Sequence, residues 1–339
     1  MPPQKPSGEG RWRVGGSAPS FIAHSSRHEG MGEIFLRTPL IRSRRQPIAA
    51  LVVFVWILSA FAGGCAKPSR GAAPISVIDD AGDSVRLKAP AHRVVSLIPA
   101  ATELLFAIGA GPSVVGRTAY CDYPPAAAAV PNLGDGIKPS IEAILARHPD
   151  LVVLYNSGQN AAVAGRLSEL GIPALRINTD ALRDVDRIGR MLGTMTGHRT
   201  EAESLATVFD TALVNATVRP AGPRPKVLLL VWEQPPMTIG RGSFLSELVE
   251  RAGGENLFQD VTASSGVVSV EAVAARNPDL IFTTTEGPVS FATRPEWQTV
   301  PAVRNHRFLR VSGSEFNRPS PRAPAAIREL AAKLGTVDR

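Results

Sequence analysis

The chain has 339 residues, of which 44% are hydrophobic and 20% are charged, and its formal net charge is +7. This length exceeds one ordinary domain, and the hydrophobic fraction is that of a folded globular protein. Eight of the 37 basic residues but only three of the 30 acidic residues lie in residues 1–65, which leaves 29 basic against 27 acidic residues in the remainder. That balance excludes an extended phosphate-binding surface, so we expect no nucleic-acid partner.

The leader, residues 1–65, has the order of an export signal. Basic residues precede an apolar block, Ile48 to Ala62, which is shorter than the roughly 20 apolar residues that a membrane span needs. The block ends in small residues before Cys65 and resembles a lipoprotein signal, although Ala62 stands where Leu is usual. We expect an extracytoplasmic protein, in the periplasm or on the outer face of the cytoplasmic membrane, anchored by lipid on Cys65. A cleaved secretory peptide and an uncleaved anchor are the alternatives, and Met31 is the expected start of translation.

A flexible tether and then a folded body follow the leader. Residues 66–74 are rich in Lys, Pro, Ser, Gly and Ala, and the folded body is expected to begin near Ile75. Short runs rich in Val, Ile and Leu then alternate with segments of helical spacing, and this alternation predicts a parallel sheet in each of two α/β lobes, at 75–181 and 224–335. The predicted strands are 94–98, 151–155 and 174–178 in the first lobe, and 226–232, 280–285 and 308–312 in the second.

The stretch 182–219 interrupts this alternation. Apolar residues recur there at helical intervals, and no strand run intervenes. A helix of this length would span roughly 50 Å at 1.5 Å per residue, longer than an ordinary domain helix. We expect it to connect the two lobes, with Gly193 and Gly197 as the positions at which it could divide.

Nearly the same dozen residues occur twice, as SIEAILARHPDL at 140–151 and SVEAVAARNPDL at 269–280. In each copy a Ser suits the N-cap of a short helix, and a Glu follows in the first turn, where the helix dipole favours an anion. Helix-end chemistry therefore explains each glutamate singly. The repetition also leaves Glu142 and Glu271 exposed at equivalent corners of two similar lobes, which is the arrangement that a symmetric partner needs.

The sequence offers little support for an enzyme or a metal protein. It lacks a GxSxG elbow, a Walker loop and a strand-linked GxGxxG motif. The histidines after the leader are scattered, which disfavours the clustered ligands of a metal site. If Cys65 carries lipid, Cys121 has no disulfide partner and is expected to be a buried apolar filler. We therefore expect no catalytic residue, no metal and no cofactor.

Six segments together carry a resemblance to a known family. They are RVVSLIPAATELLFAIGA (93–110), VVGRTAYCDYPP (114–125), SIEAILARHPDLVV (140–153), RAGGENLF (251–258), SVEAVAARNPDLI (269–281) and FNRPSPRAPAAIREL (316–330). In this order they resemble the cobalamin and siderophore-type substrate-binding proteins of ABC importers, and most closely the cobalamin-binding branch.

The resemblance implies a monomer of two Rossmann-like lobes with parallel sheets, joined by a single long connecting helix, that catalyses no reaction. It implies that cobalamin or a related corrinoid is held in the cleft between the lobes and delivered to an ABC permease dimer, whose ATPase subunits supply the energy. A ferric siderophore or haem is the alternative ligand. The resemblance also implies that Glu142 and Glu271 meet arginines of the two permease subunits, with helix capping alone as the alternative.

For the ligand site the resemblance implies a set of cleft residues. Tyr120 would lay its ring on the corrin, beside Asp122 in the same loop, or would instead be a structural plug. The second lobe would contribute Trp232, Glu233, Phe316, Asn317 and Arg318. The alternatives are that Trp232 and Phe316 belong to the core, and that Arg318 pairs with a neighbouring acid.

Two features leave the exact ligand open at this point. Close relatives carry a tryptophan near the position of Gly134 and Asp135, and this chain has none there. Arg117, Arg318 and Arg322, near the expected rim of the cleft, would suit an anionic ferric siderophore.

Overall fold

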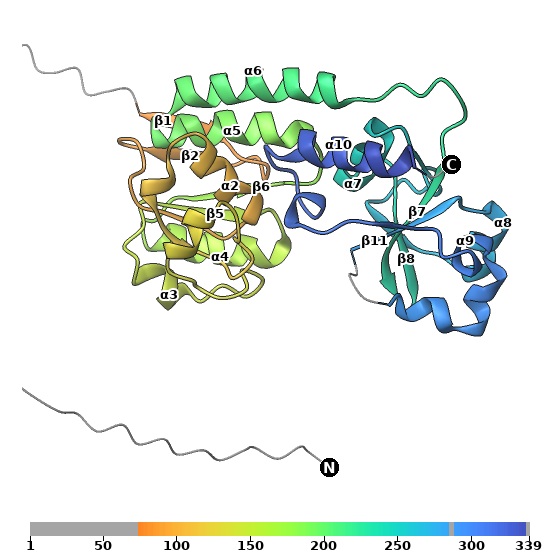
Figure 1. Cartoon of the computed structure of the whole chain (residues 1–339). Helices are drawn as coiled ribbons and strands as arrows, with labels where there is room; N and C mark the ends of the chain where they lie inside the picture. The colour runs from red at the N-terminus through yellow and green to blue at the C-terminus, as the bar shows by residue number, and fades with distance from the viewer. Residues whose placement is uncertain (1–73, 285–287, 337–339) are drawn as a thin grey trace, which may run out of the picture. The chain divides into compact units, whose positions relative to one another are not determined.

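The computed structural model describes residues 74–284 and 288–336, which belong to one compact unit (Figure 1). The predicted leader with Cys65, and the predicted tether up to residue 73, lie outside these residues. None of the described helices is long and apolar enough to cross a membrane.

The first lobe is built on a parallel sheet in the order β4-β3-β5-β6. Its strands are β3 (Val94–Ser96), β4 (Val114–Arg117), β5 (Leu151–Tyr155) and β6 (Ala174–Ile177), which confirms the three strands predicted here and adds β4. The central strands β3 and β5 are buried almost throughout, as expected for strands covered on both faces. The helices are α2 (Pro99–Ala107), α3 (Ile141–Leu145) and α4 (Gly158–Glu169), with 3-10 turns η1 (Gly111–Ser113) and η2 (Pro125–Ala129).

An antiparallel hairpin that we did not predict precedes this sheet. It consists of β1 (Ile75–Ile78) and β2 (Ser84–Leu87). Its turn closes part of the free edge of β6, because the Asp80 amide donates to the Arg176 carbonyl at 2.9 Å and the Arg176 amide donates to Asp79 at 3.1 Å. The exposed and half-buried positions of such short strands carry a weak sequence signal.

The second lobe has a mixed sheet in the order β10-β8-β7-β11-β12, with β9 also paired to β7. The strands are β7 (Lys226–Glu233), β8 (Pro236–Ile239), β9 (Glu255–Asn256), β10 (Ser265–Val267), β11 (Leu280–Thr283) and β12 (Phe308–Arg310), and they include all three predicted strands. The predicted α/β fold class is confirmed, but the sheet of this lobe is mixed where we expected a parallel one. Only Gln234 and Pro235 separate β7 from β8, too few residues for a crossover, so β8 and then β10 pair antiparallel.

Helices cover this second sheet and close its core. They are α7 (Phe244–Arg251), α8 (Val270–Arg276), α9 (Pro301–Arg304) and α10 (Ala323–Leu334), with 3-10 turns η3 (Ser290–Thr293), η4 (Pro295–Thr299) and η5 (Ser314–Phe316). Trp297 is fully buried against Phe291, with ring centroids 4.5 Å apart. The main core continues from the first lobe through Phe209 and Leu213 to α7 and α10.

The segment 182–219 between the lobes is two helices rather than the single long helix that we expected, and it divides at one of the two glycines at which the sequence allowed a break. The two helices are α5 (Arg183–Thr196) and α6 (Arg199–Ala216), which lie side by side in Figure 1. Helix α5 packs on α2 and β1 and belongs to the first lobe, whereas α6 also contacts α10 of the second lobe. The break is at Gly197, which caps α5 in the left-handed conformation with φ +80°.

We expect Gly197→Ala to lower the free energy of unfolding by about 1–2 kcal/mol, because an L-residue is disfavoured at this φ. Its Cβ would also lie 3.2 Å from the Pro90 ring. Denaturant unfolding of the purified protein measures the change. Gly165→Ala is the matched control: this glycine lies in the exposed interior of α4 with open space around it, so the substitution should raise stability by up to about 1 kcal/mol. Equal changes in the free energy of unfolding for the two substitutions would contradict the view that α5 ends at Gly197 because a glycine is needed there.

Candidate functional site

A pocket of about 730 Å³ lies where the two lobes meet. Its walls are the segments that follow β3, β4, β5 and β6 in the first lobe, and the segment around η5 in the second. Open α/β sheets hold ligands beyond the carboxyl ends of their strands, and this pocket has that position. The polar, charged and aromatic side chains that line it include Tyr120, Asp122, Asp135, Tyr155, Asp180, Asn317 and Arg318.

Tyr120 and Asp122 follow β4 and both line the pocket, as does Asn317 from the second lobe. The Tyr120 side chain is 60% exposed, so its ring is free at the pocket wall and is no structural plug. Burial opposes ionisation of Asp122, but a hydrogen bond from Arg318 and the charge of that guanidinium together hold the pKa of Asp122 below its usual value. The pocket therefore has an open aromatic face beside an ionised carboxylate.

Arg318 lines the pocket while pairing with acids of the first lobe. Its Nε donates to Glu103 at 2.7 Å, its Nη2 donates to Asp122, and its Nη1 donates to the Tyr120 carbonyl at 3.3 Å. For Arg318 the sequence left two roles open, contact with the ligand and pairing with a neighbouring acid. The structure shows the pairing, with Glu103 and Asp122. A guanidinium so occupied has limited capacity for an anionic ligand group.

Glu103 also binds Arg322, and together Glu103, Arg318 and Arg322 form what we call the interlobe cluster. Arg322 donates to both Glu103 oxygens, at 3.0 and 2.8 Å, and stacks over the Tyr123 ring at 4.1 Å. The Glu103 side chain is only 1% exposed. The cluster fastens α2 of the first lobe to the segment between η5 and α10. Our sequence interpretation missed Glu103, whose only signal is an acid among the apolar residues of ATELL.

Tyr155 and Asp180 are further pocket residues that sequence reasoning missed. The Tyr155 hydroxyl donates to Asp180 at 2.9 Å. Burial and then this hydrogen bond raise the pKa of Tyr155 to about 12, so the phenol stays protonated at neutral pH. Their positions at and just beyond the ends of predicted strands were the available signal, since those ends share one edge of a parallel sheet.

Three predicted cleft residues lie elsewhere. Phe316 is buried in the main core, so its ring cannot face a ligand and the core alternative holds. Trp232 is 60% exposed at the end of β7, and its indole donates to the Gln234 carbonyl at 2.8 Å. Glu233 pairs with Arg294 at 3.3 Å. Neither Trp232 nor Glu233 lines the pocket.

Two residues near the pocket have structural roles. Arg117, suggested for an anionic siderophore, donates to the carbonyls of Ala127 at 2.7 Å and Thr118 at 2.8 Å. Cys121 is fully buried with a free thiol, whose Sγ lies 3.1 Å from the Thr102 hydroxyl, which confirms the expected filler. Within the described ranges, no group of three or more His, Cys, Asp or Glu side chains is placed to hold a metal ion.

The repeat forms the same unit twice, and the two copies match in burial class at all twelve positions. Ser140 and Ser269 are N-caps, each accepting from a backbone amide three residues later at 3.1 Å. The aspartates near the end of each copy accept from the start of the neighbouring strand: Asp150 from the Arg93 amide at 2.9 Å, and Asp279 from the Lys226 amide at 2.8 Å. The repeated residues thus cap a helix and anchor a strand.

The glutamates of the repeat have no such packing role. Glu142 and Glu271 are both exposed. In each, a hydrogen bond from its own backbone amide, and then one from the capping serine, lowers the pKa, so both carry a charge at neutral pH. They remain available to a partner.

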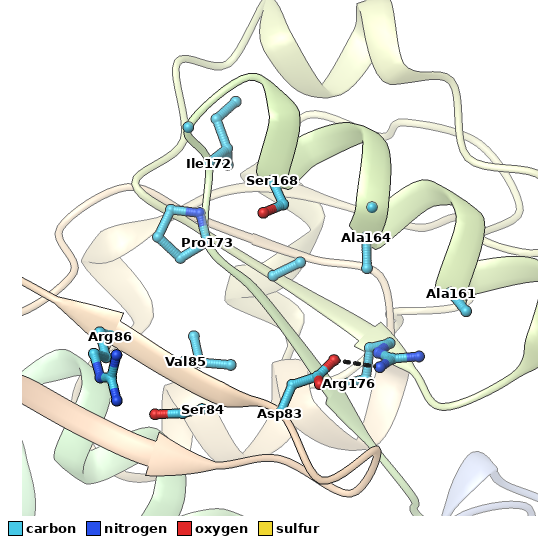
Figure 2. A pocket seen from close by; sticks show the side chains of 13 residues that line it. Asp83, Ser84, Val85, Arg86, Ala161, Ala164, Ser168, Ile172, Pro173 and Arg176 are labelled. Atoms are coloured by element: carbon cyan, nitrogen blue, oxygen red, sulfur yellow. Dashed lines mark hydrogen bonds and ion pairs between the residues drawn. The ribbon is translucent and has the colours of Figure 1, made fainter.

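A second pocket, of about 680 Å³, lies between the β1–β2 hairpin, α4 and β6 (Figure 2). Figure 2 shows small side chains of α4, such as Ala161, Ala164 and Ser168, along one wall, and the ion pair of Asp83 with Arg176 on the other. Because Pro173 leads into the amino end of β6, this pocket lies away from the carboxyl edge of the sheet. The pocket between the lobes is therefore the better candidate.

Comparison with known proteins agrees with this architecture. Residues 94–313 match the family described as periplasmic binding protein. The chain belongs to this family. The periplasmic binding protein is 28% identical over 254 residues to the vitamin B12-binding protein of Vibrio parahaemolyticus, covering 74% of this chain and 92% of the relative. It is 29% identical over 255 residues to that of Pectobacterium atrosepticum, covering 73% and 89%.

Solved structures of two kinds are similar to this periplasmic binding protein. The vitamin B12 binding protein BtuF of Vibrio cholerae has 25% identity and a TM-score of 0.59, over 74% of this chain and 99% of that chain. The heme-binding protein RhuT of Roseiflexus sp. RS-1 has 25% identity and a TM-score of 0.66, over 73% and 99%. The fold is common to both kinds, so the ligand must be argued from the pocket.

Proposed function

We propose that this periplasmic binding protein is the extracytoplasmic receptor of an ABC importer, and that it captures cobalamin or a related corrinoid in the pocket between its lobes. It then delivers the ligand to the permease and catalyses no reaction itself. The names of its relatives support this proposal. The chemistry of the pocket supports it independently.

The observation that carries the proposal is the set of groups at the pocket wall. Tyr120 and Tyr155 offer aromatic rings for a flat macrocycle. Among the described lining residues, three carboxylates, Asp122, Asp135 and Asp180, outnumber one guanidinium, Arg318, which is already paired. A corrinoid is fringed by carboxamides, whose N–H groups donate to carboxylates. A siderophore or haem with anionic groups would meet like charge, which disfavours binding.

Delivery requires attachment and docking. We propose that Cys65 carries the lipid that keeps the receptor at the membrane, and that Glu142 and Glu271 each meet a cation on one subunit of the permease dimer. Two equivalent exposed carboxylates on two similar lobes suit a partner with two-fold symmetry.

Calorimetric titration of the protein that begins at Ala66 tests the ligand. We expect saturable one-to-one binding of cyanocobalamin and of cobinamide, and no binding of a ferric hydroxamate siderophore. Tyr120→Ala should weaken corrinoid binding about tenfold, because the exposed ring loses its contact, whereas Tyr120→Phe should retain most of the affinity.

Haemin is the fourth ligand in this titration, because the exposed phenol of Tyr120 could also serve as an axial ligand to haem iron. Binding of haemin without corrinoid, abolished in Tyr120→Phe, would move the protein to haem uptake. Binding of the siderophore alone would overturn both ligand assignments.

A further inference from the structure

Both copies of the repeat hold an arginine at the same position, Arg147 in the first lobe and Arg276 in the second, but the contacts of the two side chains differ. Arg276 is neutralised within its own lobe. Its Nη1 and Nη2 bind the two oxygens of Asp260 at 2.6 and 2.8 Å, and its Nη1 also donates to the Leu257 carbonyl at 3.0 Å. The guanidinium lies over the Phe258 ring at 4.2 Å. The charge of Arg276 is thus balanced by Asp260, a residue of the same lobe.

Arg147 has none of these partners. Its Nε is buried and has no hydrogen-bond acceptor, and Arg147 forms no ion pair with any residue in 74–284 or 288–336. The Arg93 guanidinium donates to the backbone carbonyl of Arg147 at 2.5 Å, and both arginines line the same groove. A buried donor without an acceptor is costly. The described residues therefore leave hydrogen-bonding capacity of this guanidinium unused, and a charged guanidinium binds a carboxylate strongly.

An open groove lies beside Arg147 in the first lobe. The groove has a volume of about 590 Å³, and apolar residues, among them Phe106, Val115 and Pro131, line it together with Arg147. Its wall is therefore apolar apart from the arginines.

The groove opens next to Glu142. Ala146 lines it and is exposed, and it follows Glu142 by four residues on α3 and its cap. Residues four apart lie on the same face of a helix, about one turn from each other. A partner that binds Glu142 therefore also reaches the mouth of the groove.

We propose that this groove, through Arg147, receives an acidic side chain carried on an apolar segment of the permease. The inference rests on the proposed function and deepens it. The first lobe then docks through an anion and a cation together, Glu142 and Arg147, whereas the second lobe docks through Glu271 alone. Charge complementarity argues for a carboxylate as the occupant, and the apolar wall argues for a protein segment that brings apolar side chains with it.

Binding of the full-length protein to its permease–ATPase complex, held in phosphatidylcholine nanodiscs, tests the proposal. We expect Arg147→Gln to weaken docking about tenfold and Arg147→Glu to weaken it further, because the receiving carboxylate loses its partner or meets like charge. Arg276→Gln is the matched control, and docking should be unchanged. Arg147→Lys keeps the charge and should restore most of the affinity. Cyanocobalamin affinity should match the wild type for each variant. Thermal unfolding should match it for the Arg147 variants, whereas Arg276→Gln should unfold at a slightly lower temperature because it loses the pair with Asp260.

Three outcomes would overturn the inference. In the first, Arg147→Gln docks as tightly as the wild type. In the second, Arg147→Lys docks as poorly as Arg147→Gln, so that charge is not the cause. In the third, Arg147→Gln loses binding only to phosphatidylglycerol vesicles, which would make the groove a lipid site. The proposed function fails separately, if the wild type binds neither corrinoid nor permease.

Discussion

Removal of the Glu103 carboxylate is expected to lower the free energy of unfolding by about 3 kcal/mol, the lower end of the loss when one partner of a buried ion pair is deleted. The loss is at the lower end because Arg318 keeps Asp122 and Arg322 keeps Glu315. Glu103→Ala would leave two guanidinium groups, with side chains 12% and 19% exposed, without the carboxylate that both bind. The lost bonds join α2 to the segment before α10, so the contact between the lobes weakens as well. Chemical denaturation at neutral pH measures the loss.

The exposed ion pair of Arg166 with Glu169 provides the control for this prediction. Its side chains are 59% and 66% exposed, so Glu169→Ala should change stability by less than about 1 kcal/mol. Glu103→Gln keeps the shape of the side chain and can still accept hydrogen bonds. Its loss of unfolding free energy should lie between those of Glu103→Ala and Glu169→Ala. A loss at Glu103→Ala no larger than at Glu169→Ala would show that the interlobe cluster does not hold the lobes together.

Combined replacement of Glu142 and Glu271 by Ala should weaken docking to the permease about a hundredfold, at about tenfold for each charge, and reduce corrinoid uptake accordingly. Ligand affinity should not change, because neither residue lines the pocket. The fold should persist, because the capping bonds come from Ser140 and Ser269. Uptake into liposomes that contain the permease complex measures transport, and calorimetry measures ligand affinity.

Glu201→Ala is the matched control for these glutamates, since Glu201 is also an exposed acid in the first turn of a helix, α6. Its loss should leave uptake unchanged. Because the pKa of each docking glutamate is lowered, docking should persist as the pH falls toward the usual glutamate value and weaken only below it. Ligand affinity that falls in step with uptake would contradict the docking role.

Local patterns in the sequence predicted the elements but not every contact between them. The buried strands and the serine N-caps follow from short-range periodicity, and all six predicted strands are present. The sequence offered two glycines for a break between the helices, and a single residue was too weak a signal to decide that Gly197 is the one used. The antiparallel β8 depends on a two-residue connection, which the alternation of strands and helices did not indicate.

The site was harder to predict because its parts are far apart in the chain. Arg318 and Glu103 are 215 positions apart, and the sequence around either residue does not indicate that it pairs with the other. Phe316 was placed in the cleft from its segment, yet its side chain turns into the core, as the side chain of a 3-10 turn can. Tyr155 and Asp180 show that the ends of parallel strands locate pocket residues better than residue type does.

The buried, unpaired thiol of Cys121 has a consequence for how the protein matures. Cys121 is the one cysteine in the part of the chain that the structure describes, and its side chain is fully buried. The described body therefore attains its fold by noncovalent contacts alone. Folding of the described body therefore needs no disulfide oxidase or disulfide isomerase, and a reducing environment breaks no covalent cross-link within it.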